Sequence, residues 1–559
     1  MVLDYKGTKF SFQKKKQLKR RRQMTIAGGL IALVLLMIYG LSLLDWRGLS
    51  AVQNALLQGD AVAAAQLMEK AGDGLFHRTA KKELSALVLL FQGKFKEGEA
   101  ALKKLGDSDS ELSYEKLLTF LAETGRYRAL DFYADFLVQS DARREAFYFK
   151  SLARTALLDP ETSSQFMQRM PEAEKEKKRK ALELLAETNG QLQKGRVDYV
   201  FGANGTPLAY YDLKRKKTVA LVPGFDFSPF TEHFVQGIRY FKLTIDRNVQ
   251  QKIHRLFSKY YGTFILLRLE DNGILASYSK SAGKKVANAA LVEQFEPGSI
   301  VKVVTLFGYL RKRSKELFPF ECKGNMTIDG ELFYDWLPHR RVETYEHALA
   351  VSCNLAFGRM GISMGKSYLN QCFDDFFFNK EPFQDLFFQF PTGKYNTSAS
   401  TDLRLARLAV GLKEVTTTTL HSALIAGIIA QGGSAFQPHL IDNIKNVLNL
   451  GFYQQQSQLL QVYKDDPAHH RTKQAMTAVQ EDEDGTGRRA RVDFMLTALK
   501  TGTAGNKKSG LDSILMGFFP AVKPQYAFAF RLQRAGKAQL EGAYFLKRFL
   551  EQSDLIPHR

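Results

Sequence analysis

Two pairs of apolar runs, far apart in the chain, predict two β-hairpins. The first pair, TFILLRLE and ILASYSK, flanks the turn Asp271-Asn272-Gly273, and the second, SILMGFF and QYAFAFRLQ, flanks a proline-bounded segment at 520–524. Apolar runs joined by a short turn that contains Gly or Pro are typical of hairpins. The sequence between them has mainly helical patterns, and a closing helix is expected around 540–552. Strands from both ends with a helical middle predict an α+β domain.

The segment FEPGSIVKVVTLFGYL, residues 295–310, predicts a turn followed by a buried helix. Pro297-Gly298 is typical of a turn, and Ser299 falls where an N-cap or first helical turn is expected. The residues that follow are apolar on nearly every side, which indicates burial all round. Lys302 stands alone among them, three residues after Ser299 and on the same face. Burial lowers the pKa of a lysine, and a neutral amine beside a hydroxyl is a candidate base for a serine nucleophile.

Ser-x-x-Lys is a short pattern, and spacing alone favours an ordinary N-cap serine followed by a snorkelling lysine. The pattern occurs at five other places: Ser11/Lys14, Ser113/Lys116, Ser277/Lys280, Ser281/Lys284 and Ser363/Lys366.

Two further short motifs follow in the same half of the chain. Ser352-Cys353-Asn354 is the only Ser-x-Asn and is expected at a helix or helix-turn. Lys500-Thr501-Gly502-Thr503 contains the only Lys-Thr-Gly and is expected on an edge strand paired with SILMGFF. Ser352 comes 53 residues after Ser299, and Lys500 comes a further 148 residues on.

The N-terminal 44 residues predict a membrane anchor. Residues 1–23 form a basic tail, in which positions 1–22 hold nine Lys or Arg and one Asp, a net +8 of the chain's +21. Residues 24–44 carry no charge and are long enough to cross a bilayer as a helix. The positive-inside rule keeps the tail in the cytoplasm and exports the remainder. No Ala-x-Ala cleavage site follows, so we expect a retained anchor in the cytoplasmic (inner) membrane and an extracytoplasmic, periplasmic catalytic domain. The alternative, a nucleic-acid-binding tail, is disfavoured by the apolar run.

Residues 45–192 have helical periodicity and predict an all-α domain. Gly59, Gly93 and Gly125 each separate two helical patterns at nearly equal intervals, and the turn signal Asp159-Pro160 continues the series. A period of roughly 34 residues resembles tetratricopeptide repeats, although the full consensus is absent. A groove for a partner and a plain helical spacer both remain open. Residues 193–242 predict a β-containing linker or pedestal, and residues 243–559 the final domain.

The three cysteines do not form a disulfide framework. Cys322, Cys353 and Cys372 are an odd number, so at least one thiol is unpaired within the chain. A Cys322–Cys372 bridge is one option in an oxidising compartment. No cluster of Cys and His has metal-ligand spacing in the sequence.

The three motifs together resemble those of the penicillin-binding proteins, the D,D-transpeptidases of peptidoglycan synthesis, in order, kind and approximate spacing. Flanking stretches are similar too: LTIDRNVQQKI at the domain entry, RLARLAVGLKEVTTTTLHSALIAGIIAQGG, and TKQAMTAVQEDEDGTGRRARVDFMLTALKTGTAG. The resemblance covers about residues 241–534. It implies the penicillin-binding transpeptidase fold, an antiparallel sheet flanked by helices.

By this resemblance, Ser299 attacks the carbonyl of a stem peptide that ends in D-Ala-D-Ala, and Lys302 takes its proton. Ser352 relays a proton to the leaving amine, and Asn354 holds the donor peptide and contacts Lys302. Lys500 supplies positive potential beside the substrate carboxylate. Thr501, Gly502 and Thr503 complete the substrate-binding strand, with the Thr503 and Ser299 N–H groups as the oxyanion hole. β-Lactams are expected to acylate the serine, and no metal or nucleotide cofactor is expected.

The sequence departs from the family in two ways. Leu499 stands where many members have glycine, and the helical residues 45–192 stand where bifunctional members have a glycosyltransferase. We therefore expect a monofunctional transpeptidase, with a polymerase of lipid-linked precursor among its cell-wall partners. A D,D-carboxypeptidase, a penicillin-recognising sensor and a non-catalytic scaffold that uses the helical repeats are the alternatives.

Overall fold

A computed structural model of the chain describes residues 146–556 apart from 172–174, 236–239, 284–285, 313–316, 387, 446–450, 456 and 507–509. Before residue 146 it describes 61–70, 78–91 and isolated positions between 49 and 138. The basic tail, the predicted anchor at 24–44 and the three repeat glycines lie outside the described residues. None of the helices that the structure describes is both long and apolar enough to cross a membrane.

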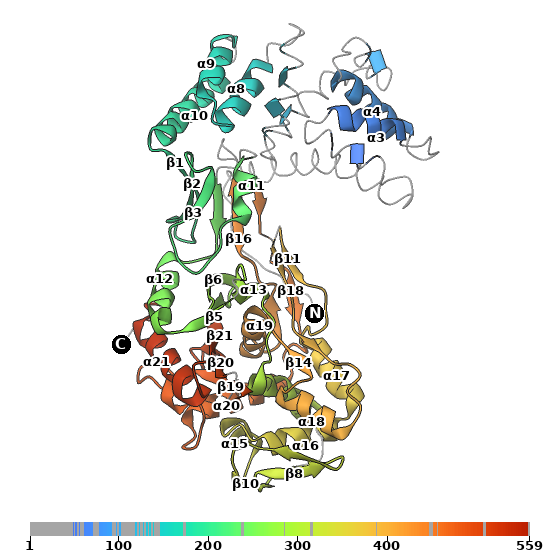
Figure 1. Ribbon diagram of the computed structural model, residues 1–559, viewed down its shortest axis with the longest axis vertical. Coiled ribbons are helices and arrows are strands. Elements are labelled where there is room, and N and C mark those ends of the chain that lie inside the picture. The colour runs from blue at the N-terminus through green and yellow to red at the C-terminus, as the bar shows by residue number, and fades with distance from the viewer. Residues whose placement is uncertain are drawn as a thin grey trace, which may run out of the picture. The chain divides into compact units, whose positions relative to one another are not determined.

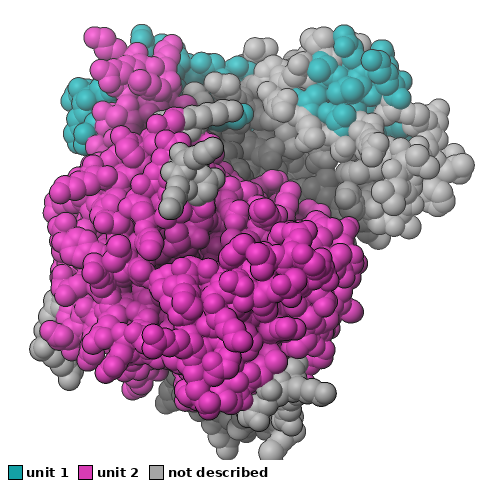
Figure 2. All heavy atoms as spheres, turned by 60° about the horizontal axis from the view of Figure 1, so that its bottom comes forward, with its two compact units in different colours: residues 1–197, 232–240, 445–452 teal, residues 198–231, 241–444, 453–559 magenta. Residues whose placement is uncertain are grey.

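The chain divides into two compact units, coloured separately in Figure 2. The first comprises residues 1–197, 232–240 and 445–452, and the second comprises 198–231, 241–444 and 453–559. The described helices of the first unit are α3 (Ala61–Lys70), α4 (Arg78–Phe91), α8 (Ala146–Ala156), α9 (Pro160–Gln168) and α10 (Lys175–Gln193).

The predicted turn at Asp159-Pro160 separates α8 from α9. Asp159 is the N-cap of α9, where its carboxylate accepts from Thr162 N, and Pro160 occupies the first helical position. In α8, the buried Lys150 pairs with Asp131 at 2.8 Å and with Asp135 at 2.5 Å. The described part of 45–192 is therefore helical as predicted, and the tetratricopeptide character stays a prediction.

A six-stranded sheet follows, with the order β17-β16-β4-β1-β2-β3. The segment 193–242 supplies β1 (Arg196–Phe201), β2 (Pro207–Asp212), β3 (Lys217–Ala220), α11 (Pro229–Val235) and most of β4 (Tyr240–Leu243). The other two strands, β16 (Ile441–Lys445) and β17 (Gly451–Gln454), come from a distant part of the chain, beyond the Ser-x-Asn motif. The pedestal is therefore larger than the segment 193–242 that the sequence predicts.

The second sheet is antiparallel, with the order β19-β20-β21-β5-β6, and contains both predicted hairpins. Its edge strand β19 carries the Lys-Thr-Gly motif and pairs with β20, as predicted. The strands are β5 (Tyr261–Arg268), β6 (Gly273–Lys280), β19 (Ala498–Asn506), β20 (Gly510–Phe519) and β21 (Tyr526–Gln533). Strands from both ends of the domain thus share one sheet, which confirms the α+β prediction.

Helices cover both faces of this sheet (Figure 1). On one face lies α19 (Thr419–Ala430), every residue of which is buried, and Thr263 of β5 hydrogen-bonds Thr419 across the contact. On the other face lies the closing helix α21 (Ala543–Gln552), whose Phe545 and Phe549 contact Phe264 of β5. Because side chains alternate along a strand, neighbouring residues of β5 serve opposite layers. The helix α12 (Arg247–Leu256), capped by Asp246, packs near β6.

The remaining elements form the helical middle of the domain and its short hairpins. The helices are α13 (Ala289–Val292), α14 (Lys302–Lys312), α15 (Tyr345–Ala350), α16 (Asn354–Met364), α17 (Lys366–Asp375), α18 (Asp402–Val410) and α20 (Pro467–Glu481). The short strands are β7 (Phe320–Cys322), β8 (Asn325–Ile328), β9 (Glu331–Tyr334), β10 (Arg340–Val342), β11 (Phe383–Asp385), β12 (Phe388–Phe390), β13 (Lys394–Tyr395), β14 (Val415–Thr416), β15 (Ser434–Phe436) and β18 (Leu459–Gln461).

Candidate active site

Ser299 lies in a 3-10 turn, η3 (Gly298–Val301), which leads directly into α14. The chain before it is fixed by paired backbone hydrogen bonds between Phe295 and Thr417, both at 2.9 Å. Gly298 has a φ of +54°, and its N–H donates to Gly411 O at 3.1 Å. A positive φ favours glycine, so the turn predicted at Pro297-Gly298 is confirmed. Ser299 is half-buried at the head of a helix that the structure buries as predicted.

The edge strand β19 runs against this turn at close range. A Cβ on Gly502 would lie 2.8 Å from Pro297 O and 3.2 Å from Ile300 N. A Cβ on Gly298 would lie 3.0 Å from Thr503 O. Glycine at both positions lets the two backbones meet, which brings Thr503 beside the Ser299 turn.

Lys302 is completely buried at the start of α14. Its ammonium donates to Ser352 O at 2.7 Å, to Asn354 Oδ1 at 2.7 Å and to Ser352 Oγ at 3.3 Å. Both residues of the Ser-x-Asn motif therefore hydrogen-bond the Lys302 amine, and for Asn354 this is the contact that the family resemblance implies.

Ser352 sits in the bend between α15 and α16, with a φ of +59°. A non-glycine residue in this region is strained and persists only where the surrounding contacts require it. The strained bend aims the Ser352 hydroxyl at both lysines, because its Oγ also accepts from Lys500 Nζ at 2.9 Å.

Lys500, on β19, is also completely buried, and it donates to Thr501 O at 2.8 Å. Thr501 Oγ1 donates to Thr486 Oγ1 at 2.6 Å, and Thr486 in turn donates to Ala350 O at 3.0 Å. Thr503 Oγ1 accepts from Ala538 N at 3.1 Å. The strand motif is thus tied to the segment before Ser352 and to the helical turn Ala538–Gly542 that precedes the last helix.

Burial sets the electrostatics of the two lysines. It lowers the pKa of Lys302 to about 8, against the opposing attraction of the nearby Asp335 carboxylate. Burial also lowers the pKa of Lys500 well below its usual value, and the charge of Lys302 lowers it further. Repulsion between the two amines therefore adds to burial in lowering the pKa of Lys500.

The structure brings together residues from all three motifs and adds two that sequence reasoning missed. Thr486 supports Thr501, and the buried Asp335 carboxylate accepts from Asn354 N at 2.8 Å. Thr486 lies within a stretch that carried the family resemblance. Asp335 had no local signal, because its role arises from a contact between separate elements, with Asn354 at the start of α16.

The thiols are arranged differently from the pairing considered above. All three cysteines are free and buried. Cys372 lies against Gly308, where an added Cβ would be 2.4 Å from its Sγ. Cys322 and Cys353 instead lie close together, with Asp335 beside them. The neighbour of Cys322 is therefore Cys353, and not Cys372.

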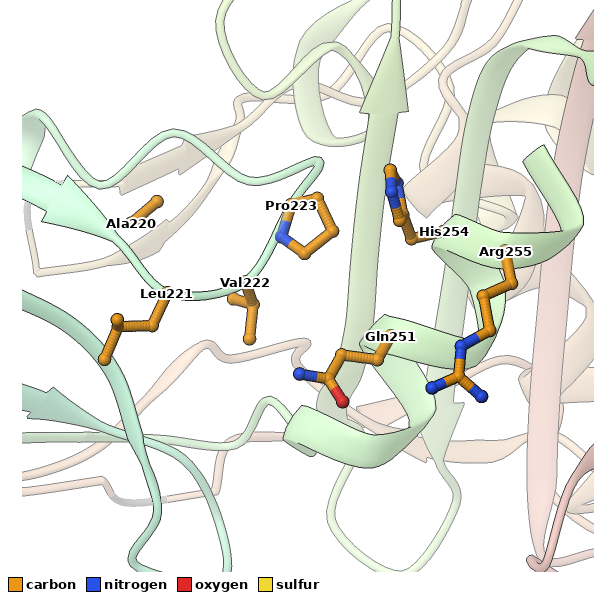
Figure 3. A pocket seen from close by; sticks show the side chains of 7 residues that line it. All are labelled: Ala220, Leu221, Val222, Pro223, Gln251, His254 and Arg255. Atoms are coloured by element: carbon orange, nitrogen blue, oxygen red, sulfur yellow. The ribbon is translucent and has the colours of Figure 1, made fainter. Parts of the chain in front are cut away.

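A surface pocket at a different place on the domain contains none of the motif residues. It is lined by residues 220–223, at the end of β3, and by Gln251, His254 and Arg255 of α12 (Figure 3). His254 Nδ1 lies 2.9 Å from Tyr278 OH, which gives the histidine a structural partner. The pocket therefore presents no nucleophile with a base, unlike the motif cluster.

The penicillin binding protein transpeptidase domain family matches residues 262–549. Stage V sporulation protein D of Bacillus subtilis is 25% identical over 355 residues, which are 58% of this chain and 53% of that protein. The peptidoglycan D,D-transpeptidase PbpA of Mycobacterium tuberculosis is 27% identical over 168 residues, which are 29% of this chain and 33% of that protein. The chain thus spans about half of the first relative and a third of the second.

Solved structures share the fold. The D,D-transpeptidase domain of a peptidoglycan glycosyltransferase from Eggerthella lenta has a TM-score of 0.57 at 20% identity, over 64% of this chain and 97% of that one. The penicillin G acyl-enzyme complex of penicillin-binding protein A from M. tuberculosis has a TM-score of 0.56 at 18% identity, over 64% and 99%. The family match covers more than half of the 559 residues and encloses all three motifs. The chain therefore belongs to the penicillin-binding protein transpeptidase family.

Proposed function

We propose that this protein is a membrane-anchored, serine-type D,D-transpeptidase that crosslinks peptidoglycan stem peptides and is acylated by β-lactams. The observation that carries the proposal is the position of Ser352 Oγ, which lies 3.3 Å from Lys302 Nζ and 2.9 Å from Lys500 Nζ. One hydroxyl lies between two buried amines, and the amine of Lys302 comes from the helix that directly follows the turn of the half-buried Ser299. This arrangement can supply a nucleophile, a base and a proton path.

In the first half of the reaction, Ser299 Oγ attacks the carbonyl of the penultimate D-alanine while Lys302 accepts the hydroxyl proton. Lys302 must be neutral to do so, and with a pKa of about 8 roughly a tenth of it is neutral at pH 7. The terminal D-alanine leaves as an amine that receives a proton through Ser352. An acyl-enzyme remains, in which the stem peptide is esterified to Ser299.

Lys500 couples this chemistry to binding of the substrate carboxylate. A buried amine with a lowered pKa gains a proton when an anion arrives beside it, because the anion stabilises the charged form. The positive Lys500 then disfavours a charge on Lys302 through their repulsion. Carboxylate binding at Lys500, Thr501 and Thr503 therefore favours the neutral, basic form of Lys302.

The oxyanion of the tetrahedral intermediate is assigned to the backbone N–H groups of Ser299 and Thr503. The close approach of Gly298 to Thr503 supports this assignment. Loss of one such donor typically costs about 2.7–4 kcal/mol in the barrier.

The second substrate decides the product. An amine from a neighbouring stem peptide gives a crosslink, whereas water gives D,D-carboxypeptidase activity on the same acyl-enzyme. We favour the crosslink because the similar proteins from M. tuberculosis are described as peptidoglycan D,D-transpeptidases.

The N-terminal part gives the enzyme its place in the cell. The uncharged run at 24–44, after a basic tail, supports a single-pass anchor in the cytoplasmic membrane with the catalytic domain outside. The helical residues 45–192 would offer a docking surface to other cell-wall proteins, among them a polymerase of lipid-linked precursor. Co-purification of the full chain that recovers no such polymerase would argue against this partnership.

The first test is covalent labelling of the purified full chain with a fluorescent penicillin. We expect one labelled residue, mapped to Ser299 by mass spectrometry, and no label in Ser299→Ala. Ser363→Ala, in another Ser-x-x-Lys of the same domain, is the matched control and should label like the parent. A folded parent that takes no label, or an alanine variant that labels normally, would contradict the proposal. Product analysis with a stem-peptide donor and acceptor then separates crosslinking from carboxypeptidase activity.

A further inference from the structure

Three metal-ligating side chains lie together next to the Ser-x-Asn motif, and a fourth, that of His339, lies beside one of them. Cys322 ends β7, Asp335 follows β9, His339 precedes β10, and Cys353 is the N-cap of α16. The ligand atoms of Cys322, Asp335 and Cys353 all lie within 4.8 Å of one another. The strands β7 and β10 pair through Cys322 and Arg340, which holds His339 beside the same group.

Asp335 is at the centre of this group, and its side chain has no exposed surface. Its Oδ2 accepts from Asn354 N at 2.8 Å and from Cys322 Sγ at 3.4 Å. Its Oδ1 lies 3.6 Å from His339 Nε2. The two oxygens of one buried carboxylate therefore face a thiol and an imidazole.

His339 Nε2 is the second observation that points to a ligand. The nitrogen is buried in a side chain that is only 5% exposed, and at 3.6 Å from Asp335 Oδ1 it makes no hydrogen bond within the described part of the chain. Nearly all buried polar atoms in proteins are hydrogen-bonded or bound to an ion, so this nitrogen is a candidate ligand for an ion. Its ring is held edge-on against Trp336, with centroids 5.4 Å apart.

The donor set matches one class of cation. Tetrahedral zinc sites use Cys, His and Asp ligands at about 2.0–2.3 Å, which places neighbouring ligand atoms about 3.3–3.8 Å apart. The 3.4 Å from Cys322 Sγ to Asp335 Oδ2 falls in that range, and His339 Nε2 lies 3.6 Å from the other oxygen of the same carboxylate. Two sulfur ligands disfavour magnesium and calcium, which prefer oxygen.

We propose that Cys322, Asp335, His339 and Cys353 bind a zinc ion. Binding displaces the thiol protons, and the ion offsets two of the three negative charges on two thiolates and a carboxylate that would otherwise repel one another in a buried site. The N-terminus of α16 adds to this, since Cys353 Sγ accepts from Ala356 N at 3.4 Å and a helix N-terminus favours negative charge.

The zinc ion would be structural, and it would affect the active site through the residues next to its ligands. Cys353 is flanked by Ser352 and Asn354, the two residues that hold Lys302. Asp335, as a ligand, would also fix Asn354 through its backbone N–H. The metal would thus fix the conformation of the strained bend that carries Ser352. Zinc binding itself is independent of the proposed function, whereas its effect on acylation rests on that function.

The test is the metal content of the purified full chain, measured by plasma mass spectrometry without chelators. We expect about one zinc ion per chain. Cys322→Ser and Cys353→Ser should lose it, and His339→Ala should release it to a chelator at least about tenfold more readily. Cys372→Ser is the matched control, because this buried thiol lies against Gly308 outside the cluster, and it should retain the metal.

Cobalt replacement tests the site without any substitution. The cobalt-loaded parent should show thiolate-to-cobalt absorption and the intense visible bands of tetrahedral coordination. A metal-free parent with no such spectrum would overturn the proposal, and so would zinc retained equally by the Cys322→Ser and Cys353→Ser variants. A Cys322–Cys353 disulfide found by peptide mapping of the parent would overturn it in favour of an oxidised pair.

Penicillin labelling separates this proposal from the previous one. Removal of zinc by a chelator should slow the labelling of the parent, and addition of zinc should restore the rate. A zinc-loaded parent that takes no label would contradict the transpeptidase function and leave the metal site established.

Discussion

Lys500 Nζ donates to Ser352 Oγ at 2.9 Å and so joins residues 148 positions apart in the chain. The same oxygen also accepts from Lys302. A hydroxyl oxygen with two amine donors has its own proton left to give, so a proton leaving one amine can be replaced through the other. This geometry supports the proposed proton relay through Ser352, and changes to any of the three residues should alter acylation.

Acylation should depend on pH through Lys302. Burial lowers the pKa of this amine to about 8, and only the neutral form accepts the Ser299 proton. Because the neutral fraction rises with pH, the acylation rate constant should increase about tenfold per unit below pH 8 and level off above it. Stopped-flow measurement of penicillin acylation across this range gives the profile.

Lys302→Arg is the variant that tests the assignment. Arginine keeps the positive charge but does not lose its proton in proteins. The acylation rate should fall by about 10²–10⁴ relative to the parent plateau above pH 8, and the variant should show no rise near pH 8. A parent profile that is flat from about pH 6 to 9, or an arginine variant that keeps the parent profile, would exclude Lys302 as the base.

Substitutions of Ser352 should differ in their effect on stability but agree in their effect on activity. Its φ of +59° costs a non-glycine residue about 1–2 kcal/mol, so Ser352→Gly should be about 1 kcal/mol more stable than Ser352→Ala. Both variants lose the relay hydroxyl and should acylate about 10²–10⁴-fold more slowly than the parent. Thermal unfolding followed together with penicillin labelling measures both effects. An alanine variant more stable than the glycine variant would show that the bend is not strained.

Local patterns were sufficient for much of the catalytic fold. Both hairpins follow from apolar runs around a Gly- or Pro-containing turn, and the buried helix after Ser299 follows from its uniformly apolar sequence. The edge position of Lys500 was also predictable, because its strand precedes a polar turn and an apolar strand. Each of these features depends on residues that are close to one another in the sequence.

Long-range contacts account for what the sequence did not predict. The strands β16 and β17 complete the pedestal sheet although they lie about 200 residues after its other strands in the sequence, and no local pattern predicts that pairing. The cluster around Asp335 unites residues spread from 322 to 353, so its spacing resembles no short ligand motif. Thr486 gains its role only when α20 and β19 bring its loop to Thr501.

Thr486 should act as a positioning residue for Thr501. Its hydroxyl accepts from Thr501 Oγ1 at 2.6 Å and donates to Ala350 O at 3.0 Å. Thr486→Val keeps the shape and the backbone hydrogen bond to Ala350 O but leaves Thr501 Oγ1 without this acceptor, which costs about 1–3 kcal/mol for a buried polar group. We expect a stem-peptide donor to show a raised KM with a smaller change in kcat, since Thr501 is assigned to the substrate carboxylate. Thr486→Ser, which restores the hydroxyl, should recover the parent KM; a serine variant as impaired as valine would assign the effect to packing.

Gly502 should control the distance between the Lys-Thr-Gly strand and the Ser299 turn. A Cβ at this position would lie 2.8 Å from Pro297 O and 3.2 Å from Ile300 N, and both are backbone atoms that cannot rotate away. Gly502→Ala should therefore push β19 outward and separate the Thr503 and Ser299 N–H groups, with a loss of about 10²–10³ in acylation rate. Gly190→Ala is the matched control, because nothing lies within 4 Å of its added Cβ in α10. That variant should acylate like the parent and gain about 0.5–1 kcal/mol in the stability of its helix, since alanine loses less backbone entropy than glycine. Penicillin acylation rates and thermal unfolding of both variants measure the contrast, and a Gly502→Ala enzyme with the parent rate would place the oxyanion donors elsewhere.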